Sequence, residues 1–128
     1  MLVSNFFPFH RLHGILGATG PGTSRPPTEG ILIGALVLNY ADGERQECEI
    51  RYGRHVRDWW TCNDSRNDTD LGKVAWYKET PASMEMWTDL RLYHCTWENP
   101  RPDVEVVSID FVSKMTSTAP FIIGLTVE

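Results

Sequence analysis

The sequence predicts an all-β protein, built as an antiparallel β-sandwich. Short runs rich in β-branched and aromatic residues recur along the chain, and turn-forming residues separate them. One of these separations, Asp42-Gly43, is a strong hairpin signal, because both residue types accept the backbone angles of a tight two-residue turn. No stretch shows a sustained helical period. The 128 residues are enough for one domain with its own core.

Seven runs are expected to form strands. They follow an N-terminal arm over residues 1–10, so the sandwich domain is expected to span residues 11–128. Ile31–Tyr40 is apolar on both faces, which is typical of a strand buried on both sides. Glu44–Tyr52 alternates instead, as a half-buried strand does. The predicted strands are Arg11–Ala18, Ile31–Tyr40, Glu44–Tyr52, Lys73–Tyr77, Trp87–Trp97, Val104–Ser113 and Phe121–Glu128.

The long aromatic run Trp87–Trp97 and the turn after it carry two specific expectations. Strand alternation places Arg91, Tyr93, Cys95 and Trp97 on one face. We expect the Trp97 ring to lie in the core. Asn99-Pro100 must leave the extended ladder, so Asn99 is expected to hold the turn through side-chain hydrogen bonds to backbone.

Composition excludes several classes of function. The net charge is −5 and the isoelectric point about 5.3, which argues against a general nucleic-acid binder. No apolar run reaches the roughly 18 residues that a membrane-spanning helix needs. The three cysteines, Cys48, Cys62 and Cys95, form no C-x-x-C pair, so neither a complete disulfide framework nor a cysteine zinc site is expected.

The stretch Arg51–Trp60 (RYGRHVRDWW) concentrates charged and aromatic residues and is the candidate binding site. Neighbouring side chains of a strand point to opposite faces, so one of the adjacent tryptophans is expected in the core and the other at the surface. A surface ring beside charged groups suits a sugar, which offers C–H faces to rings and hydroxyls to charges. The alternative is that both rings are structural and that Arg57 and Asp58 pair to hold a turn. The candidate ligand-binding residues are Arg54, Arg57, Asp58, Trp59 and Trp60.

Other chemistry-bearing residues indicate no catalytic or metal site. The loop Asn63–Asp70 is rich in oxygen ligands of the kind that calcium prefers, but it lacks the EF-hand pattern and is typical of a solvated turn. The four histidines show no metal-binding spacing. A Cys62–His55 nucleophile and an Asp58–Glu98 carboxylate pair have no supporting spacing, and no phosphate-binding or hydrolase motif occurs. We therefore expect no cofactor, no metal and no enzymatic activity.

Several longer motifs carry a resemblance to a known family. The runs YADG (40–43), YGRHVRDWW (52–60), VAW (74–76), TWENPRPDVEVVSIDFVS (96–113) and APFIIGLTVE (119–128) resemble a bacterial β-sandwich domain of uncharacterised function, found in multidomain proteins of planctomycetes. That domain is similar in layout to the galactose-binding-like jelly rolls that serve as carbohydrate-binding modules. The resemblance implies a jelly-roll type of sandwich. Members of the family have further strands upstream of the segment matching residues 11–18, so an open sheet edge or a covering arm is expected here.

These observations favour a non-catalytic module that binds carbohydrate or a partner protein. The alternative is a structural or assembly domain that acts by self-association without a small ligand, and a sugar-active enzyme is the remaining alternative. The apolar arm, with three phenylalanines before His10, is expected either to cover a sheet edge in its own molecule or to reach a second copy. On this basis we expect a homodimer.

Overall fold

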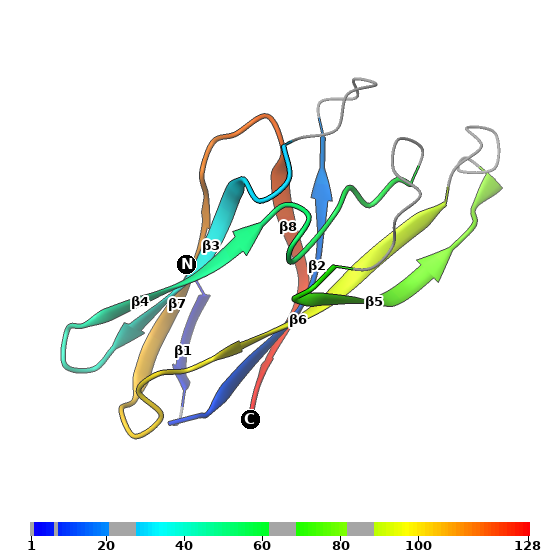
Figure 1. Cartoon of the computed structure of the whole chain (residues 1–128). Helices are drawn as coiled ribbons and strands as arrows, with labels where there is room; N and C mark the ends of the chain where they lie inside the picture. The colour runs from blue at the N-terminus through cyan, green and yellow to red at the C-terminus, as the bar shows by residue number, and fades with distance from the viewer. Residues whose placement is uncertain (1, 7, 21–27, 62–68, 82–88) are drawn as a thin grey trace.

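The computed structural model describes residues 2–6, 8–20, 28–61, 69–81 and 89–128, which form eight β-strands (Figure 1). Apart from one helical residue at Pro81, these described residues contain no helix, so the all-β prediction is confirmed. No helix among them is long and apolar enough to cross a membrane. The strands are β1 Leu2–Phe6, β2 Arg11–Thr19, β3 Leu32–Tyr40, β4 Arg45–Arg51, β5 Gly72–Lys78, β6 Leu90–Glu98, β7 Val106–Ser113 and β8 Ala119–Val127.

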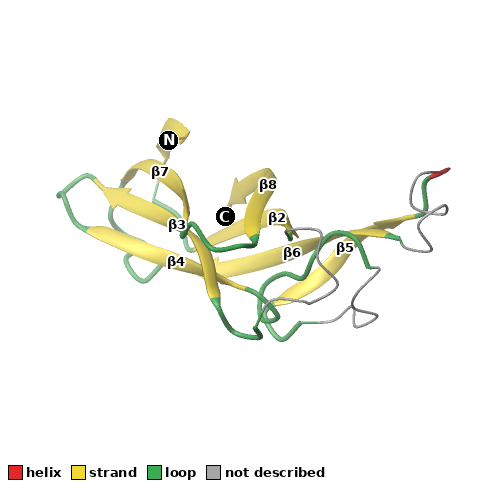
Figure 2. Ribbon diagram, turned by 90° about the horizontal axis from the view of Figure 1, so that it is seen from above, coloured by secondary structure: helices red, strands yellow, loops and turns green. Residues whose placement is uncertain are grey.

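The strands form two four-stranded sheets. The first sheet has the order β1-β7-β3-β4 and the second the order β5-β6-β2-β8, and every pairing is antiparallel. Strand β8 lies against β3 of the other sheet (Figure 2). Side chains from both sheets form one buried cluster, as a sandwich requires. The core residues are Phe9, Leu12, Leu16, Ala18, Ile33, Leu36, Leu38, Tyr40, Cys48, Ile50, Tyr52, Val56, Tyr93, Cys95, Trp97, Val106 and Ile109.

The central hairpin of the first sheet follows the sequence pattern closely. Six consecutive residues of β3, from 33 to 38, are buried, so the strand is covered on both faces as predicted. Strand β4 returns beside it after the Asp42-Gly43 turn, where Gly43 has a φ of 90° that disfavours residues with a Cβ. Cys48 and Ile50 face the core from β4.

The N-terminal arm expected over residues 1–10 contains a strand. Residues 2–6 form β1, which pairs with β7 at the edge of the first sheet. The arm therefore covers a sheet edge in its own molecule, one of the two alternatives considered for it.

The two expectations for β6 and the following turn are confirmed. Trp97 is 9% exposed in the core, and its ring Nε1 donates to the backbone oxygen of Glu49 at 2.9 Å. Asn99 is buried, and its Nδ2 donates to the Phe9 carbonyl at 2.8 Å. Its Oδ1 accepts the backbone N–H of Arg101 at 3.0 Å, so the side chain holds the turn.

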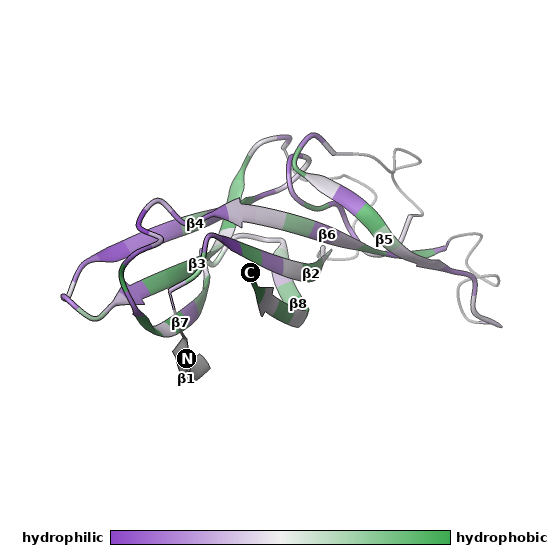
Figure 3. Cartoon of the chain, turned by 90° about the horizontal axis from the view of Figure 1, so that it is seen from below, coloured by the Kyte–Doolittle hydropathy of each residue, from purple (hydrophilic) through white to green (hydrophobic). Residues whose placement is uncertain are grey.

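The edge strands differ in charge. Strand β4 carries Arg45, Glu47, Glu49 and Arg51 and is largely hydrophilic in Figure 3. Strand β5 carries two lysines. Strand β8, at the far edge of the second sheet, carries no charged residue over nine positions, and its Ile123 side chain is 65% exposed. Charged edges discourage pairing with another chain, and β8 lacks that protection.

Candidate functional site

The stretch Arg51–Trp60 leaves the first sheet and joins the second. After β4, the backbone turns sharply: His55 N–H donates to the Arg51 carbonyl at 2.9 Å, and Gly53 N–H donates to the Val56 carbonyl at 2.7 Å. This turn brings residues 58–60 across to the end of the second sheet. The candidate residues are therefore divided between a turn and a short extended segment.

The extended segment 58–60 lies between the ends of two strands. Asp58 forms a parallel bridge with Ala18 of β2, and Trp60 forms an antiparallel bridge with Leu90 of β6. Trp59 N–H donates to the Ala18 carbonyl at 2.9 Å, and its carbonyl accepts the N–H of Arg91 at 2.9 Å. Backbone hydrogen bonds on both sides thus hold the tryptophans at a defined place.

Trp59 and Trp60 form a ring cluster with Phe121 of β8. The Trp59 and Trp60 centroids are 5.4 Å apart with planes at 73°, and those of Trp59 and Phe121 are 5.8 Å apart with planes at 85°. These edge-to-face geometries are the favourable ones for aromatic pairs. Phe121 lies over Gly17, where any Cβ would overlap its ring. We call Trp59, Trp60 and Phe121 the ring cluster.

The expected division into one core ring and one surface ring is not observed. Both Trp59 and Trp60 are half-buried, and they contact each other. The physical reason is that residue 59 lies at a bend, so the strict alternation of a regular strand does not apply.

The Asp58 carboxylate caps the backbone on either side of the ring cluster. Its Oδ2 accepts the N–H of Gly20 and its Oδ1 that of Trp60, both at 2.9 Å. The backbone carbonyl of Asp58 accepts the Nε–H of Arg91, a fully buried guanidinium, at 2.9 Å. A carboxylate offers about four lone-pair positions, so Asp58 retains capacity to accept further hydrogen bonds.

The two arginines of the predicted site form ion pairs with residues of other loops. Arg57 is 5% exposed and forms a short ion pair with Glu29, with Nη1 and Oε1 at 2.5 Å. Arg54 is exposed and pairs with Asp70 at 3.2 Å. The structure thus brings Asp58, Trp59 and Trp60 together, while Arg54 and Arg57 hold the turn to other loops.

The carboxylate pair considered for sugar hydrolysis is too widely spaced. Asp58 bridges to Ala18 at one end of β2, whereas Glu98 is paired with Arg11 at the other end. Seven residues of strand span about 23 Å. Glycosidase carboxylates lie roughly 5 to 10 Å apart, so these two do not flank one bond.

Two buried thiols are poor nucleophiles. Burial raises the pKa of the Cys48 thiol to about 11 and that of Cys95 to about 12, so both stay protonated at neutral pH. Burial also lowers the pKa of His55 to about 4, so its ring stays neutral, with Nδ1 accepting the Arg51 N–H at 2.9 Å. Cys62, and the oxygen-rich loop except for residues 69 and 70, lie outside the described residues.

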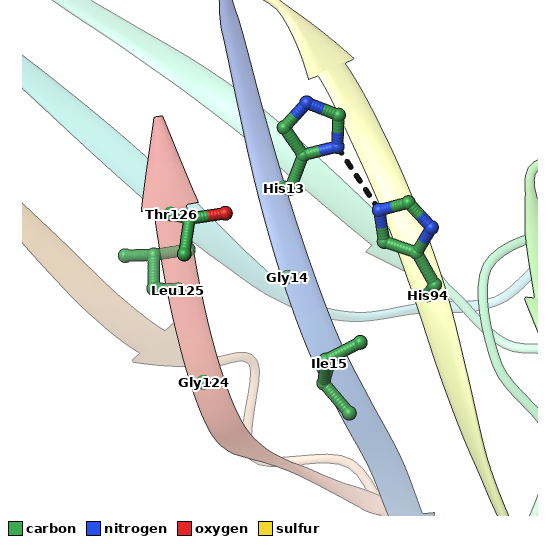
Figure 4. Close-up of a pocket in the computed structure, with 7 residues that line it drawn as sticks. All are labelled: His13, Gly14, Ile15, His94, Gly124, Leu125 and Thr126. Atoms are coloured by element: carbon green, nitrogen blue, oxygen red, sulfur yellow. Dashed lines mark hydrogen bonds between the residues drawn. The ribbon is translucent and has the colours of Figure 1, made fainter. Parts of the chain in front are cut away.

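A second polar feature was not predicted from the sequence. On the second sheet, His13 of β2 and His94 of β6 stack, with ring centroids 5.2 Å apart, and His13 Nδ1 lies 3.0 Å from His94 Nε2 (Figure 4). They flank a shallow pocket of about 280 Å³. The histidines are 81 residues apart, so only the strand pairing reveals their contact. Within the described part of the chain, no group of three or more His, Cys, Asp or Glu side chains is arranged to hold a metal ion.

Comparisons of the chain with protein-family models, with curated proteins and with solved structures found no match. The family resemblance carried by the sequence motifs therefore stays a prediction.

Proposed function

We propose that this chain is a non-catalytic module that binds carbohydrate through the ring cluster. The observation that carries the proposal is the position of Trp59 and Trp60: both rings are half-exposed and rigidly held, beside a carboxylate with hydrogen-bonding capacity. Rigid aromatic surface next to a few polar groups is the usual composition of a small-ligand site. A galactose-binding-like jelly-roll type, which the motifs suggest, agrees with this proposal.

The proposed binding mode assigns separate roles to the rings and to Asp58. A sugar ring places its C–H face on the exposed surface of Trp60 or Trp59, and a hydroxyl donates to a free lone pair of Asp58. Arg91 and the backbone hydrogen bonds of Trp59 hold the ring cluster in place, so little conformational entropy is lost on binding.

The direct test is titration of the protein with neutral oligosaccharides while tryptophan fluorescence is recorded. The panel should contain β-linked gluco-, xylo-, manno- and galacto-oligosaccharides at millimolar concentration. We expect saturable quenching with at least one of them. Trp60→Ala should then weaken binding about tenfold or more, equivalent to about 1.4 kcal/mol.

The matched control is Trp76→Ala. Trp76 is 40% exposed on β5, so it tests whether any exposed tryptophan gives the same effect. Binding that survives Trp60→Ala but is lost in Trp76→Ala would move the site to β5. Absence of binding across the whole panel would refute the carbohydrate proposal.

A second candidate function, self-association, is favoured by the β8 edge. This strand pairs only with β2 among the described strands, and it exposes Ile123 and Val127. Because β8 bears no charge, two copies can pair antiparallel about a two-fold axis without placing like charges opposite each other. We infer that the homodimer expected from the sequence forms along β8.

Light scattering at micromolar concentration tests this second candidate. Ile123→Lys introduces a charge at the middle of the edge and should convert a dimer to monomer. Met115→Lys is the control, because Met115 is 89% exposed and lies outside β8. A wild-type chain that stays monomeric, or a dimer that persists in Ile123→Lys, would exclude the β8 interface.

A further inference from the structure

The outer surface of the second sheet carries a polar network centred on His13. Its Nε2 lies 3.0 Å from Glu128 Oε1, and its Nδ1 lies 3.0 Å from His94 Nε2. The Thr96 hydroxyl is 3.2 Å from the same Nδ1. Arg11 pairs with Glu128 at 3.2 Å. His13 is five residues from Ala18 along β2, about 17 Å, so this network is separate from the ring cluster.

Glu128 determines which nitrogen of His13 carries the proton. The Glu128 carboxylate lies 3.0 Å from His13 Nε2 and 3.2 Å from the Arg11 guanidinium, so it accepts a hydrogen bond from His13 Nε2. In the neutral ring the proton then sits on Nε2, and Nδ1 presents a lone pair toward His94. A carboxylate on the far nitrogen of a histidine is the usual outer-shell partner of a metal-binding imidazole.

The spacing of the two facing nitrogens suits a shared metal ion. Bonds of about 2.0 to 2.1 Å place two imidazole nitrogens about 2.9 Å apart at a right angle and about 3.3 to 3.4 Å apart at the tetrahedral angle. The observed 3.0 Å lies between these values. A metal ion can therefore replace the shared proton when both rings rotate so that their lone pairs converge on the ion, while the separation of the two nitrogens changes by at most about 0.4 Å. The adjoining pocket, which Gly124 leaves open, gives room for further ligands (Figure 4).

We propose that His13 and His94 form a two-nitrogen site for a late first-row divalent metal ion, with Glu128 as the positioning residue. Imidazole suits Cu²⁺, Ni²⁺ and Zn²⁺, and affinity follows the order in which Cu²⁺ binds most tightly. Water completes the coordination from the pocket side. The sheet supplies the rigidity, because the two histidines are on paired neighbouring strands.

Chelator-treated protein should be titrated with Cu²⁺, Ni²⁺ and Zn²⁺ by calorimetry. We expect one ion per chain, tightest for Cu²⁺, and a Cu²⁺ electron paramagnetic resonance spectrum with coupling to two imidazole nitrogens. The spectrum counts nitrogens in the wild-type chain, so this readout does not depend on any variant folding.

Variants separate the ligands from the positioning residue. His13→Gln and His94→Gln should each weaken Cu²⁺ binding more than about tenfold. Glu128→Gln keeps a hydrogen-bond acceptor but loses the negative charge, so it should weaken Cu²⁺ binding about tenfold. His10→Gln is the control, because His10 is exposed outside the network and should bind as the wild type does. Absence of saturable binding would overturn the proposal. So would unchanged binding in the His13→Gln/His94→Gln double variant, or an equal loss in His10→Gln.

Discussion

Replacing Asn99 by alanine should destabilise the fold far more than loss of one small polar side chain suggests. Asn99 Oδ1 accepts the Tyr40 hydroxyl at 2.5 Å and the Arg101 N–H at 3.0 Å, and its Nδ2 donates to the Phe9 carbonyl at 2.8 Å. Tyr40 is only 2% exposed, so its hydroxyl cannot turn to bulk water, and the lost acceptor costs about 1 to 3 kcal/mol. The other two bonds contribute about 0.5 to 1.5 kcal/mol each. We expect the free energy of unfolding to fall by about 2 to 6 kcal/mol.

Urea denaturation followed by tryptophan fluorescence measures this change, with an unchanged slope showing that the comparison is valid. A double-mutant cycle with Tyr40→Phe isolates the hydroxyl bond. Asn99→Ala leaves the Tyr40 hydroxyl without its acceptor, and Tyr40→Phe removes that hydroxyl. The stability loss of the double variant should therefore be at least about 1 kcal/mol smaller than the sum of the losses of the two single variants. Asn39→Ala is a matched control: Asn39 is half-buried on β3 and bonds Ser108, Asp110 and Arg45, but water reaches these partners, so its loss should stay near 1 kcal/mol.

Two results would refute this reasoning. A fall in the free energy of unfolding below about 1 kcal/mol in Asn99→Ala would show that water forms hydrogen bonds with the groups that Asn99 had bonded. Additivity of Asn99→Ala and Tyr40→Phe within about 0.5 kcal/mol would show that the short bond between them carries no coupling energy.

Three further predictions follow from burial and close contact. Trp97→Ala should lower the free energy of unfolding by about 3 to 5 kcal/mol in urea denaturation, because it leaves a cavity in the core and removes the hydrogen bond to Glu49. A loss under about 1 kcal/mol would contradict the burial of the ring. Gly72→Ala should lower the melting temperature markedly, because its Cβ would overlap the backbone oxygen of His55, whereas Gly124→Ala, which meets open space, should change it little; equal effects would be inconsistent with this packing. Burial lowers the pKa of His55 to about 4, so between about pH 6.5 and pH 4 the unfolded state binds a proton on this ring that the folded state does not bind. The free energy of unfolding should therefore fall by about 2 to 3 kcal/mol over this pH range. His55→Asn should remove that part of the pH dependence, and an unchanged slope would refute the assignment.

Local pattern was sufficient for the strands and for much of the core. Alternation in Glu44–Tyr52 correctly predicts that Cys48 and Ile50 are buried, and the aromatic run ending at Trp97 correctly predicts its inward face. These predictions succeed because side-chain direction in a strand depends only on neighbouring residues. Strand β1 was missed: its five residues, LVSNF, show no alternation, and its membership of the sheet depends on pairing with β7.

The candidate site was predicted only in part. The sequence pointed to Trp59, Trp60 and Asp58, which the structure brings together. It did not indicate Phe121 as the third ring, because Phe121 reaches Trp59 from β8 across Gly17. Contacts of this kind depend on which strands become neighbours.

The sequence by itself determined the all-β class, the position of seven strands, the β3–β4 turn and the inward faces, since each of these depends on the periodicity and turn chemistry of a few adjacent residues. Only the tertiary structure decided which polar groups meet. His13 meets His94 because the register of β2 and β6 pairs His13 with Thr96 and Ile15 with His94, which makes the two histidines diagonal neighbours on one face. Arg57 forms its ion pair with Glu29, 28 residues earlier in the chain. Register and strand order are set by packing of the whole core, so residues far apart in the chain acquire their partners only when both sheets have formed.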